Sequence, residues 1–396
     1  MTMRTSKTTR ACWRCASRGQ TVNKLLIYQT AIGTILLPFV IYTFYFTTSL
    51  MRTLGPISDP GFTQPATYTR FDLFWLRFLK DERDLPFIYL SIRISLTVIP
   101  LAILLYMPFV TGWLWGIVAV TYLYLNNLVF KGPFGLMLHC TSHRPLFKPA
   151  YKNAYLYVTW VMAPFFGQTP ETYYSHHIGM HHPENNVDPD GSTTMPYQRD
   201  SFRSFLAYFG GFFLFGVYEL IEYLRLRKRM KLVYWALLGE SSFLFLCIGL
   251  SFVSFQATLV VFILPFLIFR FITMLGNWTQ HAFVCAEEPL NPYKNSITCI
   301  NVYYNHKCRN DGYHISHHDR PAMHWTEHPA FFQKTIDKYA KNQAIIFDQL
   351  DFLGVFVNLM RKRYDVLASH VVNVNGAFRD DAEIEAVLRQ RTKRIR

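Results

Sequence analysis

The sequence predicts an all-α integral membrane protein with two transmembrane hairpins, an extra N-terminal hydrophobic segment and a helical cap. Three observations predict this class. First, the 396 residues are 51% hydrophobic and 17% charged, whereas ordinary soluble domains carry about 25% charged residues. Second, the apolar residues are bunched into runs, each long enough for the roughly 20 residues that a helix needs to cross a bilayer. Third, histidines gather in four clusters that follow these runs.

The apolar runs form two pairs and one isolated segment. In chain order they are 25–50, 86–108, 112–130, 232–254 and 256–275. The second and third runs are separated by the short Val-Thr-Gly-Trp turn at 110–113, and the fourth and fifth turn near 251–256. Each pair is interpreted as a helical hairpin. Because a hairpin returns the chain to the side it left, both pairs place the segments after them on one membrane face.

A further apolar stretch, 203–224, is interpreted as an interfacial or re-entrant helix. It ends in Glu219 and Glu222 and is followed by a basic cluster over 225–231. A full crossing here would divide the histidine clusters between the two sides of the membrane. The basic residues flank apolar runs instead of forming one soluble patch, so the net charge of +14 indicates a membrane surface and not nucleic acid.

The first residues of the chain are basic, rich in Ser and Thr, and lack acidic side chains. This composition is typical of an organellar transit peptide and equally of a basic juxtamembrane tail. The first reading predicts a plastid or other organelle membrane, and the second the endoplasmic reticulum or plasma membrane. The predicted regions are the leader 1–24, an N-terminal hydrophobic segment and loop 25–84, a membrane domain 85–330 and a soluble helical tail 331–396.

Nine histidines are the candidate metal ligands. Neutral imidazole binds iron, zinc and copper, and residues three or four apart on a helix point to one face. A pair at that spacing followed by an adjacent histidine therefore offers two or three nitrogens to a common point. The candidates are His139, His143, His177, His181, His182, His281, His314, His317 and His318. Nine imidazoles on one membrane face predict a two-metal site.

Other classes of function are less well supported. The chain has no glycine-rich phosphate loop, no Gly-x-Ser-x-Gly and no His-Glu-x-x-His. A metal-handling transporter would carry its ionisable ligands inside the membrane spans, whereas these histidines lie at span ends and in loops. The chain also has no His-Pro-Gly-Gly, the signature of a fused cytochrome b-type haem domain, so electrons for redox chemistry must come from an external carrier.

The order of the motifs, HxxxH, HxxxHH, NxxxH and HxxHH, resembles that of the membrane fatty-acyl desaturases, over roughly residues 85–330. The resemblance implies two non-haem iron ions held by the nine histidines. It also implies that Asn277, one turn before His281, joins the site through a water. His176 stands beside His177, and only His177 has the HxxxHH spacing.

The resemblance further implies an acyl-lipid or acyl-thioester substrate, dioxygen, and ferredoxin or a cytochrome b-type protein as electron donor. Related members act on alkanes and carotenoids, so a membrane di-iron hydroxylase or oxygenase remains the alternative to a desaturase. Carboxylates and amides usually fix the tautomers of ligating imidazoles. The candidates that flank the motifs are Glu171, Asn185, Asn186, Asp188, Asp190, Asn310, Asp311 and Asp319.

Overall fold

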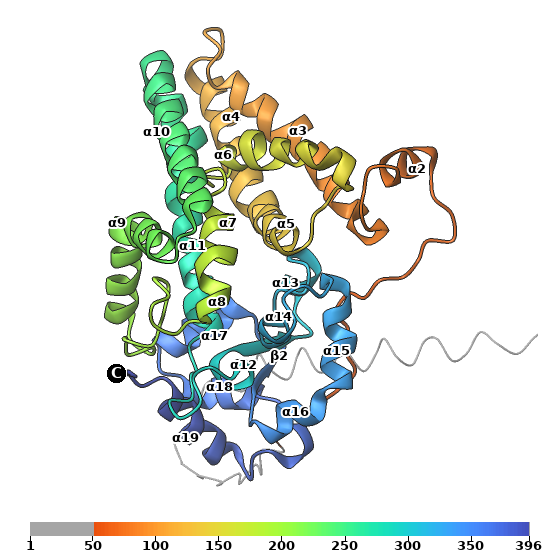
Figure 1. The fold of residues 1–396 in the computed structure, drawn as a ribbon, viewed down its shortest axis with the longest axis vertical. Helices are drawn as coiled ribbons and strands as arrows, with labels where there is room; N and C mark the ends of the chain where they lie inside the picture. The colour runs from red at the N-terminus through yellow and green to blue at the C-terminus, as the bar shows by residue number, and fades with distance from the viewer. Residues whose placement is uncertain (1–50, 396) are drawn as a thin grey trace, which may run out of the picture. The chain divides into compact units, whose positions relative to one another are not determined.

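The computed structural model describes residues 51–395, so the predicted leader 1–24 and the apolar run 25–50 lie outside the described residues. The prediction of a helical membrane protein is confirmed, because four helical segments are long and apolar enough to cross a membrane. They are Glu82–Leu104, Gly112–His143, Phe202–Leu226 and Met230–Gln280. Figure 1 shows the two helical hairpins in its upper part and the short helices of residues 292–391, which form a cap, in its lower part.

The first predicted hairpin is present. Pro86, at the start of α3, lacks the N–H that a first helical turn leaves unpaired. Residues 105–111 join α3 to α4 and contain the start of the predicted turn. After α4 the chain continues through one π-helical turn into α5, which ends at His143. The bounds are α2 Arg70–Leu76, η1 Glu82–Asp84, α3 Leu85–Leu104, α4 Gly112–Tyr124, η2 Leu125–Phe130 and α5 Lys131–His143.

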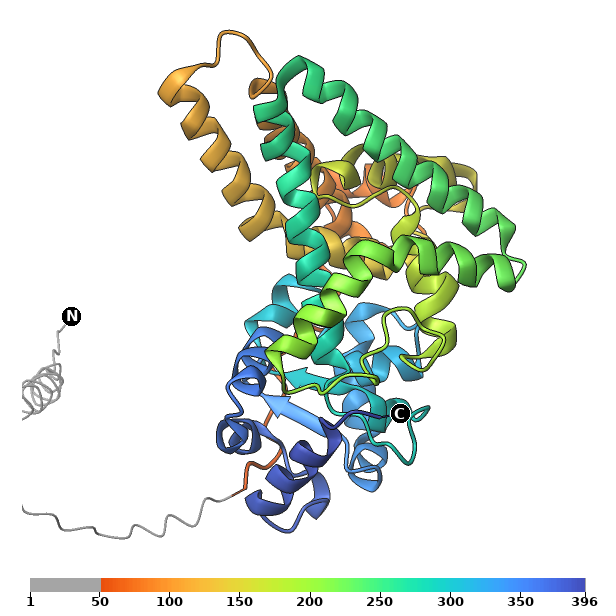
Figure 2. The same ribbon diagram turned by 90° about the vertical axis from the view of Figure 1, so that its left-hand side faces the viewer.

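The second hairpin turns at Ser254, inside the predicted turn. Its backbone has φ −159° and ψ 104°, which leaves the helical region and separates the two arms. Figure 2 shows these arms rising to a tip and returning toward the cap. The second arm ends next to His281, which therefore lies at the cap end of the hairpin. The bounds are α10 Met230–Thr258, η6 Leu259–Ile263 and α11 Leu264–Gln280.

The helix α9, Phe202–Leu226, has the length and apolarity of a span. In Figures 1 and 2 it nevertheless lies below the tips of both hairpins, near the helices that carry the second histidine motif. The charged segment 225–231, which we call the basic loop, begins in the last turn of α9 and runs into the start of α10. This placement agrees with an interfacial helix, and the crossing state of α9 stays a prediction.

Six short helices lie between α5 and α9, and the last two of them carry the second histidine motif. They are η3 Pro149–Tyr155, η4 Tyr157–Met162, α6 Ala163–Phe165, α7 Thr172–His176, η5 His177–His181 and α8 His182–Glu184. The connection 167–170 passes very close to the second hairpin. A Cβ on Gly239 would lie 1.7 Å from the Pro170 carbonyl oxygen, so only glycine fits there.

The cap is mainly helical and contains a small sheet that the sequence did not predict. Strands β1 (Ile297–Ile300) and β2 (Ile345–Asp348) pair in parallel, with Ile297 opposite Ile345. Their side chains join residues up to Leu388 in one buried apolar core, so the C-terminal region packs with the segment that follows α11. The cap helices are α12 Pro292–Asn295, α13 Tyr303–Lys307, α14 His314–Asp319, η7 Trp325–Glu327, α15 His328–Lys334, α16 Ile336–Lys341, α17 Phe352–Met360, α18 Tyr364–His370, η8 Val374–Gly376 and α19 Asp381–Arg391.

Polar side chains inside the membrane part bind backbone carbonyls where the helices are irregular. Tyr122 donates to the Val261 carbonyl in the π-helical turn η6, at 2.8 Å. Asn126 and Lys131 donate to the carbonyls of Phe165 and Phe166, at 2.8 and 2.9 Å. Water does not reach such groups in a bilayer, so an unpaired carbonyl would cost several kcal/mol. These contacts hold the ends of α5, α6 and α11 together.

The hairpins predict that the histidine-bearing segments and the cap lie on one side of the membrane. We expect an impermeant maleimide to label Asp188→Cys and Lys341→Cys from the same side, because an interfacial α9 leaves the hairpins as the only crossings between residues 85 and 280. Thr111→Cys, at the exposed tip of the first hairpin, should be labelled only from the opposite side. Labelling of the first two cysteines from different sides would mean that α9 crosses.

Candidate metal centre

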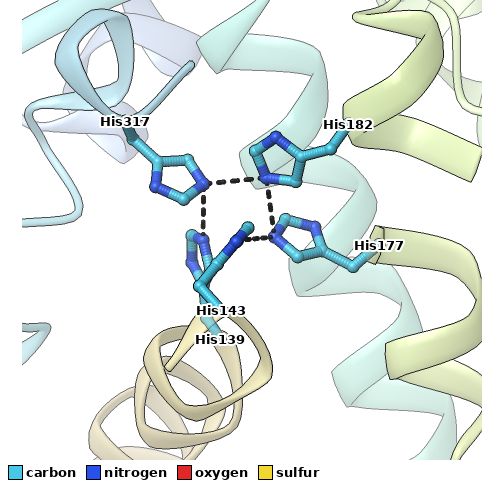
Figure 3. Close-up of side chains that lie close together, drawn as sticks. All are labelled: His139, His143, His177, His182 and His317. Carbon is cyan, nitrogen blue, oxygen red and sulfur yellow. Dashed lines mark hydrogen bonds between the residues drawn. The ribbon is translucent and has the colours of Figure 1, made fainter. Parts of the chain in front are cut away.

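The structure brings all nine predicted histidines together in two groups. The first contains His139, His143, His177, His182 and His317, and the second contains His181, His281, His314 and His318. Within each group, one ring nitrogen from every histidine lies within 4.8 Å of the others. We call them the first and second clusters. Figure 3 shows the rings of the first cluster converging from α5, from the second motif and from α14.

Helix α5 contributes to the first cluster alone. His139 and His143 are one turn apart at its C-terminal end, with ring centroids 5.5 Å apart. Their Nε2 atoms lie 2.9 Å from the Nε2 atoms of His317 and His177, respectively. The spacing of four residues therefore acts as predicted here, because an α-helix places such residues on one face.

The second motif divides between the clusters in a way that the α-helical spacing did not predict. His177 and His181 were expected to share a face, but Nε2 of His177 lies 3.1 Å from Nε2 of His182 instead. The reason is that His177–His181 forms a π-helical turn, in which the His182 N–H binds the His177 carbonyl. Residues five apart then share a face, and His181 is turned toward the second cluster.

Helix α14 also serves both clusters. His314 and His318, four residues apart, have Nε2 atoms 3.0 Å apart in the second cluster. His317 lies between them in sequence and contacts His139 and His182 in the first. His281, directly after α11, completes the second cluster with its Nε2 3.2 Å from that of His314. Two adjacent pairs, His181–His182 and His317–His318, thus connect the two clusters through single peptide bonds.

Burial keeps these imidazoles neutral. It lowers the pKa of His177, His182, His314, His317 and His318 well below 6.5, and neighbouring imidazoles add to the effect. Burial likewise lowers the pKa of His281 to about 4. Neutral imidazole is the form that ligates metals. The protein therefore has these donors ready at pH 7, with no protons to release from them.

Three polar side chains contact Nδ1, the ring nitrogen that points away from the cluster, in three of the histidines. Asp190 lies 2.8 Å from Nδ1 of His181, Asn295 lies 3.0 Å from Nδ1 of His281, and Asp311 lies 3.4 Å from Nδ1 of His139. Such contacts place the proton on Nδ1 and turn the Nε2 lone pair inward. Inward lone pairs 3 Å apart repel one another unless a cation lies between them. The donor set therefore fits a metal ion in each cluster.

These polar groups are themselves tied to one another. Asn186 donates its backbone N–H to Asp190 at 3.2 Å and its side-chain amide to Asn295 at 3.1 Å. Ser192 donates both its N–H and its hydroxyl to Asp190, at 2.8 and 2.7 Å. The supports of His181 and His281 are consequently one hydrogen-bonded unit, although the two histidines are far apart in the sequence.

Asn277 lies beside this unit. Its amide donates to the Ser192 carbonyl at 2.9 Å and to the Tyr208 hydroxyl at 2.7 Å, and its backbone carbonyl accepts from the His281 N–H. The implied contact to a metal through a water stays a prediction.

Among the other flanking candidates, Asp190, Asn186 and Asp311 contact the ligands or their supports. The rest bind elsewhere: Glu171 accepts from Trp160, and Asp319 accepts from Tyr293. Asn185 and Asn310 donate to backbone carbonyls of other loops, and Asp188 is exposed. The sequence analysis missed Asn295 and Ser192, because neither stands in a histidine motif and only the fold brings them to the rings.

The remaining histidines lie outside both clusters. His176 packs its ring against Phe212, in agreement with the choice of His177 on spacing. His324 and Asp84 form a buried pair at 3.0 Å, and His328 accepts from or donates to Ser316 at 2.7 Å. Both His324 and His328 line a polar cavity that reaches His139 and His317 of the first cluster. His306 is exposed on α13.

A second cavity lies on the membrane side of the first cluster. Its wall includes Leu138, Tyr155, Ala163, Pro170, Tyr173 and Tyr174. The Tyr173 ring stacks on the ring of His177, with centroids 5.2 Å apart and planes 17° apart. The wall thus combines aromatic and apolar residues with the polar side chains of Ser142, Thr159, Gln168, Thr169 and Glu171, and Tyr173 brings it to a candidate metal ligand.

Comparison with known proteins identifies one family. The family model described as fatty acid desaturase matches residues 128–349, a range that contains all nine histidines of the two clusters. No curated protein and no solved structure matches the chain.

The two clusters predict two separable metal sites. We expect purified protein to contain two iron atoms per chain, because nine imidazoles exceed the six positions of one octahedral ion. His317→Ala and His181→Ala should each remove the iron of one cluster, and elemental analysis with protein quantification measures this. His306→Ala is the matched control and should retain both irons. Active protein that contains only one zinc per chain would contradict the assignment.

Proposed function

The chain belongs to the fatty acid desaturase family, a family of oxidoreductases, and we propose that it introduces a double bond into a fatty-acyl chain with dioxygen and two bound iron ions. The observation that carries this proposal is the pair of histidine clusters, of which His143 and His281 lie at the ends of two of the four apolar helical segments. The substrate is proposed to be an acyl group in a lipid or a thioester. The geometry at a membrane surface supports a substrate that enters from the bilayer.

Iron suits the donor set because imidazole binds it well and leaves positions for dioxygen. Two bound irons would supply the redox chemistry that takes hydrogen from an unactivated methylene. The protein's own part is to hold the ligands and to exclude water. Asp190, Asn295 and Asp311 orient three of the rings, and the apolar helices around the clusters keep the site dry.

The membrane-side cavity supports an acyl substrate. Leu138 and Tyr155 offer apolar surface, and Tyr173 continues that surface to the ring of His177. An alkyl chain that lies along this wall would bring a methylene next to the first cluster. Burial of apolar surface contributes about 0.8 kcal/mol per CH₂, which is sufficient to hold a chain of ordinary fatty-acid length without a specific polar contact along it.

The loop 225–231 supports docking of an external electron donor. Arg225 and Arg227 are exposed, and Arg227 forms an ion pair with Glu184 at 2.8 Å. Arg229 donates to the carbonyl of Gly179, which lies inside the second histidine motif. A carrier bound to this loop would therefore lie next to a backbone segment that holds ligands of both clusters. An acidic partner is indicated, because complementary charge steers association.

The basic residues of this loop also indicate the compartment that the metal centre faces. Lys and Arg favour the cytoplasmic face of a membrane, or the stroma or matrix in an organelle, and soluble electron carriers occur in those compartments. We propose ferredoxin as the donor in a plastid membrane and a cytochrome b-type protein in the endoplasmic reticulum.

Expression in a desaturase-null host tests the reaction. We expect a fatty-acyl product that has lost two hydrogen atoms relative to its precursor, detected by mass spectrometry of the total lipids. The protein with His317→Ala should give no product, and the protein with His306→Ala should give the wild-type amount. A product that has gained one oxygen atom would instead establish the hydroxylase alternative.

Charge reversal in the basic loop tests the donor. Lys228→Glu with Lys231→Glu should raise the KM for an acidic carrier about tenfold at low salt and leave kcat nearly unchanged, because rim charges act mainly on association. Lys341→Glu, an exposed lysine in the cap, is the matched control. Turnover with substrate and dioxygen in the absence of any donor would exclude the need for a carrier.

A further inference from the structure

Arg199 is buried completely and has six backbone carbonyls around its guanidinium group. Its Nε donates to Ala282 at 3.0 Å, and its Nη2 donates to Arg391 and Lys393 at 2.9 and 2.6 Å. Its Nη1 contacts the carbonyls of Thr194, Met195 and Tyr197 at 3.2–3.3 Å. Within the described residues, the guanidinium group forms no hydrogen bond or ion pair with a carboxylate. This side chain is therefore a cation that binds backbone alone.

Three of the six carbonyls lie at or just beyond two helix ends that the sequence separates by more than one hundred residues, and the other three belong to the loop that carries Arg199 itself. Ala282 follows the end of α11, and Arg391 and Lys393 flank the end of α19. Of the three, only the Arg391 carbonyl is the last of its helix, and such a carbonyl has no partner within the helix and carries partial negative charge. Ala282 and Lys393 each lie two residues beyond their helix. A guanidinium group, with five N–H donors in a rigid plane, can satisfy several carbonyls at once.

Burial lowers the pKa of Arg199 to about 10, so the group remains protonated at pH 7. An unpaired buried charge costs several kcal/mol, and hydrogen bonds to many acceptors offset that cost. Loss of the side chain would remove a hydrogen bond from each of these buried carbonyls, and among those near the helix ends only that of Arg391 keeps a second donor in the described part of the chain, the Val284 N–H.

The end of α11 carries a ligand of the second cluster. His281 directly precedes Ala282, and its backbone carbonyl accepts from the Thr194 hydroxyl at 2.8 Å. Thr194 and Arg199 lie on the same segment as Asp190, which holds His181. In residues 51–395, the side chains of Thr194 and Arg199 form no hydrogen bond with a histidine of the first cluster. Their structural influence is thus directed at the second cluster.

The C-terminal segment closes this arrangement. The backbone N–H of Arg199 donates to the Thr392 carbonyl at 2.9 Å, and the N–H of Ile395 donates to Met195 at 2.9 Å. The N–H of Val284, three residues after His281, donates to the Arg391 carbonyl. The end of α19 and the residues after it are therefore hydrogen-bonded both to the loop that contains Arg199 and to the residues that directly follow His281.

We propose that Arg199 and Thr194 are positioning residues of the second cluster, and that they hold His281 in place by fastening the end of α11 to the C-terminal segment. This inference rests on the proposed two-metal site. Its consequence is selective: loss of either side chain weakens metal binding at the second cluster and leaves the first cluster intact.

The test is a metal titration of metal-free protein in detergent with Co²⁺, whose absorption bands report each binding step. Wild-type protein should bind two Co²⁺ per chain. Thr194→Val, which removes only the hydroxyl, should weaken one step about 10–100-fold, the usual effect of losing a contact that supports a ligand. Thr194→Ser keeps the hydroxyl and should restore wild-type binding. Arg199→Gln should weaken the same step at least as much.

Double variants identify the affected cluster. Thr194→Val added to His181→Ala should cause no further loss of binding sites, because both act on the second cluster. Added to His317→Ala, it should weaken the single step that remains. Wild-type binding by Thr194→Val, or an equal loss in Thr194→Ser, would overturn the proposal, even if Arg199→Gln failed to fold. Failure of wild-type protein to bind two metals would instead reject the two-metal site itself.

Discussion

The repulsion between inward lone pairs of buried imidazoles is the constraint on which the site depends. Nε2 atoms of different histidines lie about 3 Å apart in both clusters, and burial prevents most of the rings from relieving this by protonation. A cation between the nitrogens resolves the conflict. Asp190, Asn295 and Asp311 each contact Nδ1 of one histidine. This leaves the Nε2 lone pair of that ring free for a metal.

The membrane part supplies the rigid frame that this arrangement needs. In a bilayer every backbone group must be paired inside the protein, yet the helices here are interrupted by π-helical turns. Tyr122 binds a carbonyl inside η6, and Asn126 and Lys131, in and just after η2, bind carbonyls at the end of α6. The irregular turns are thereby retained without exposing polar backbone to lipid, and another π-helical turn, η5, directs the adjacent histidines His181 and His182 to different clusters.

The cap contributes more than a cover for the membrane part. Helix α14 supplies three ligands, and the C-terminal residues pack with the segment after His281 in a common core. Arg199 extends that packing to the helix ends beside the second cluster. The two clusters therefore differ in their support: Asp311 of the cap holds His139 of the first cluster, whereas Asp190 from the segment before α9 and Asn295 of the cap hold His181 and His281 of the second.

The sequence by itself determined the hairpins, the identity of the nine histidines and the metal-dependent class of chemistry, because each depends on local pattern. Run length predicts a span, and motif spacing predicts neighbouring ligands. Only the tertiary structure decided how the histidines divide. A π-helical turn pairs His177 with His182 and sends His181 to the other cluster. It also decided which groups support the rings, since Asn295 and Arg199 reach the second cluster through contacts between segments far apart in the chain, which no local pattern records.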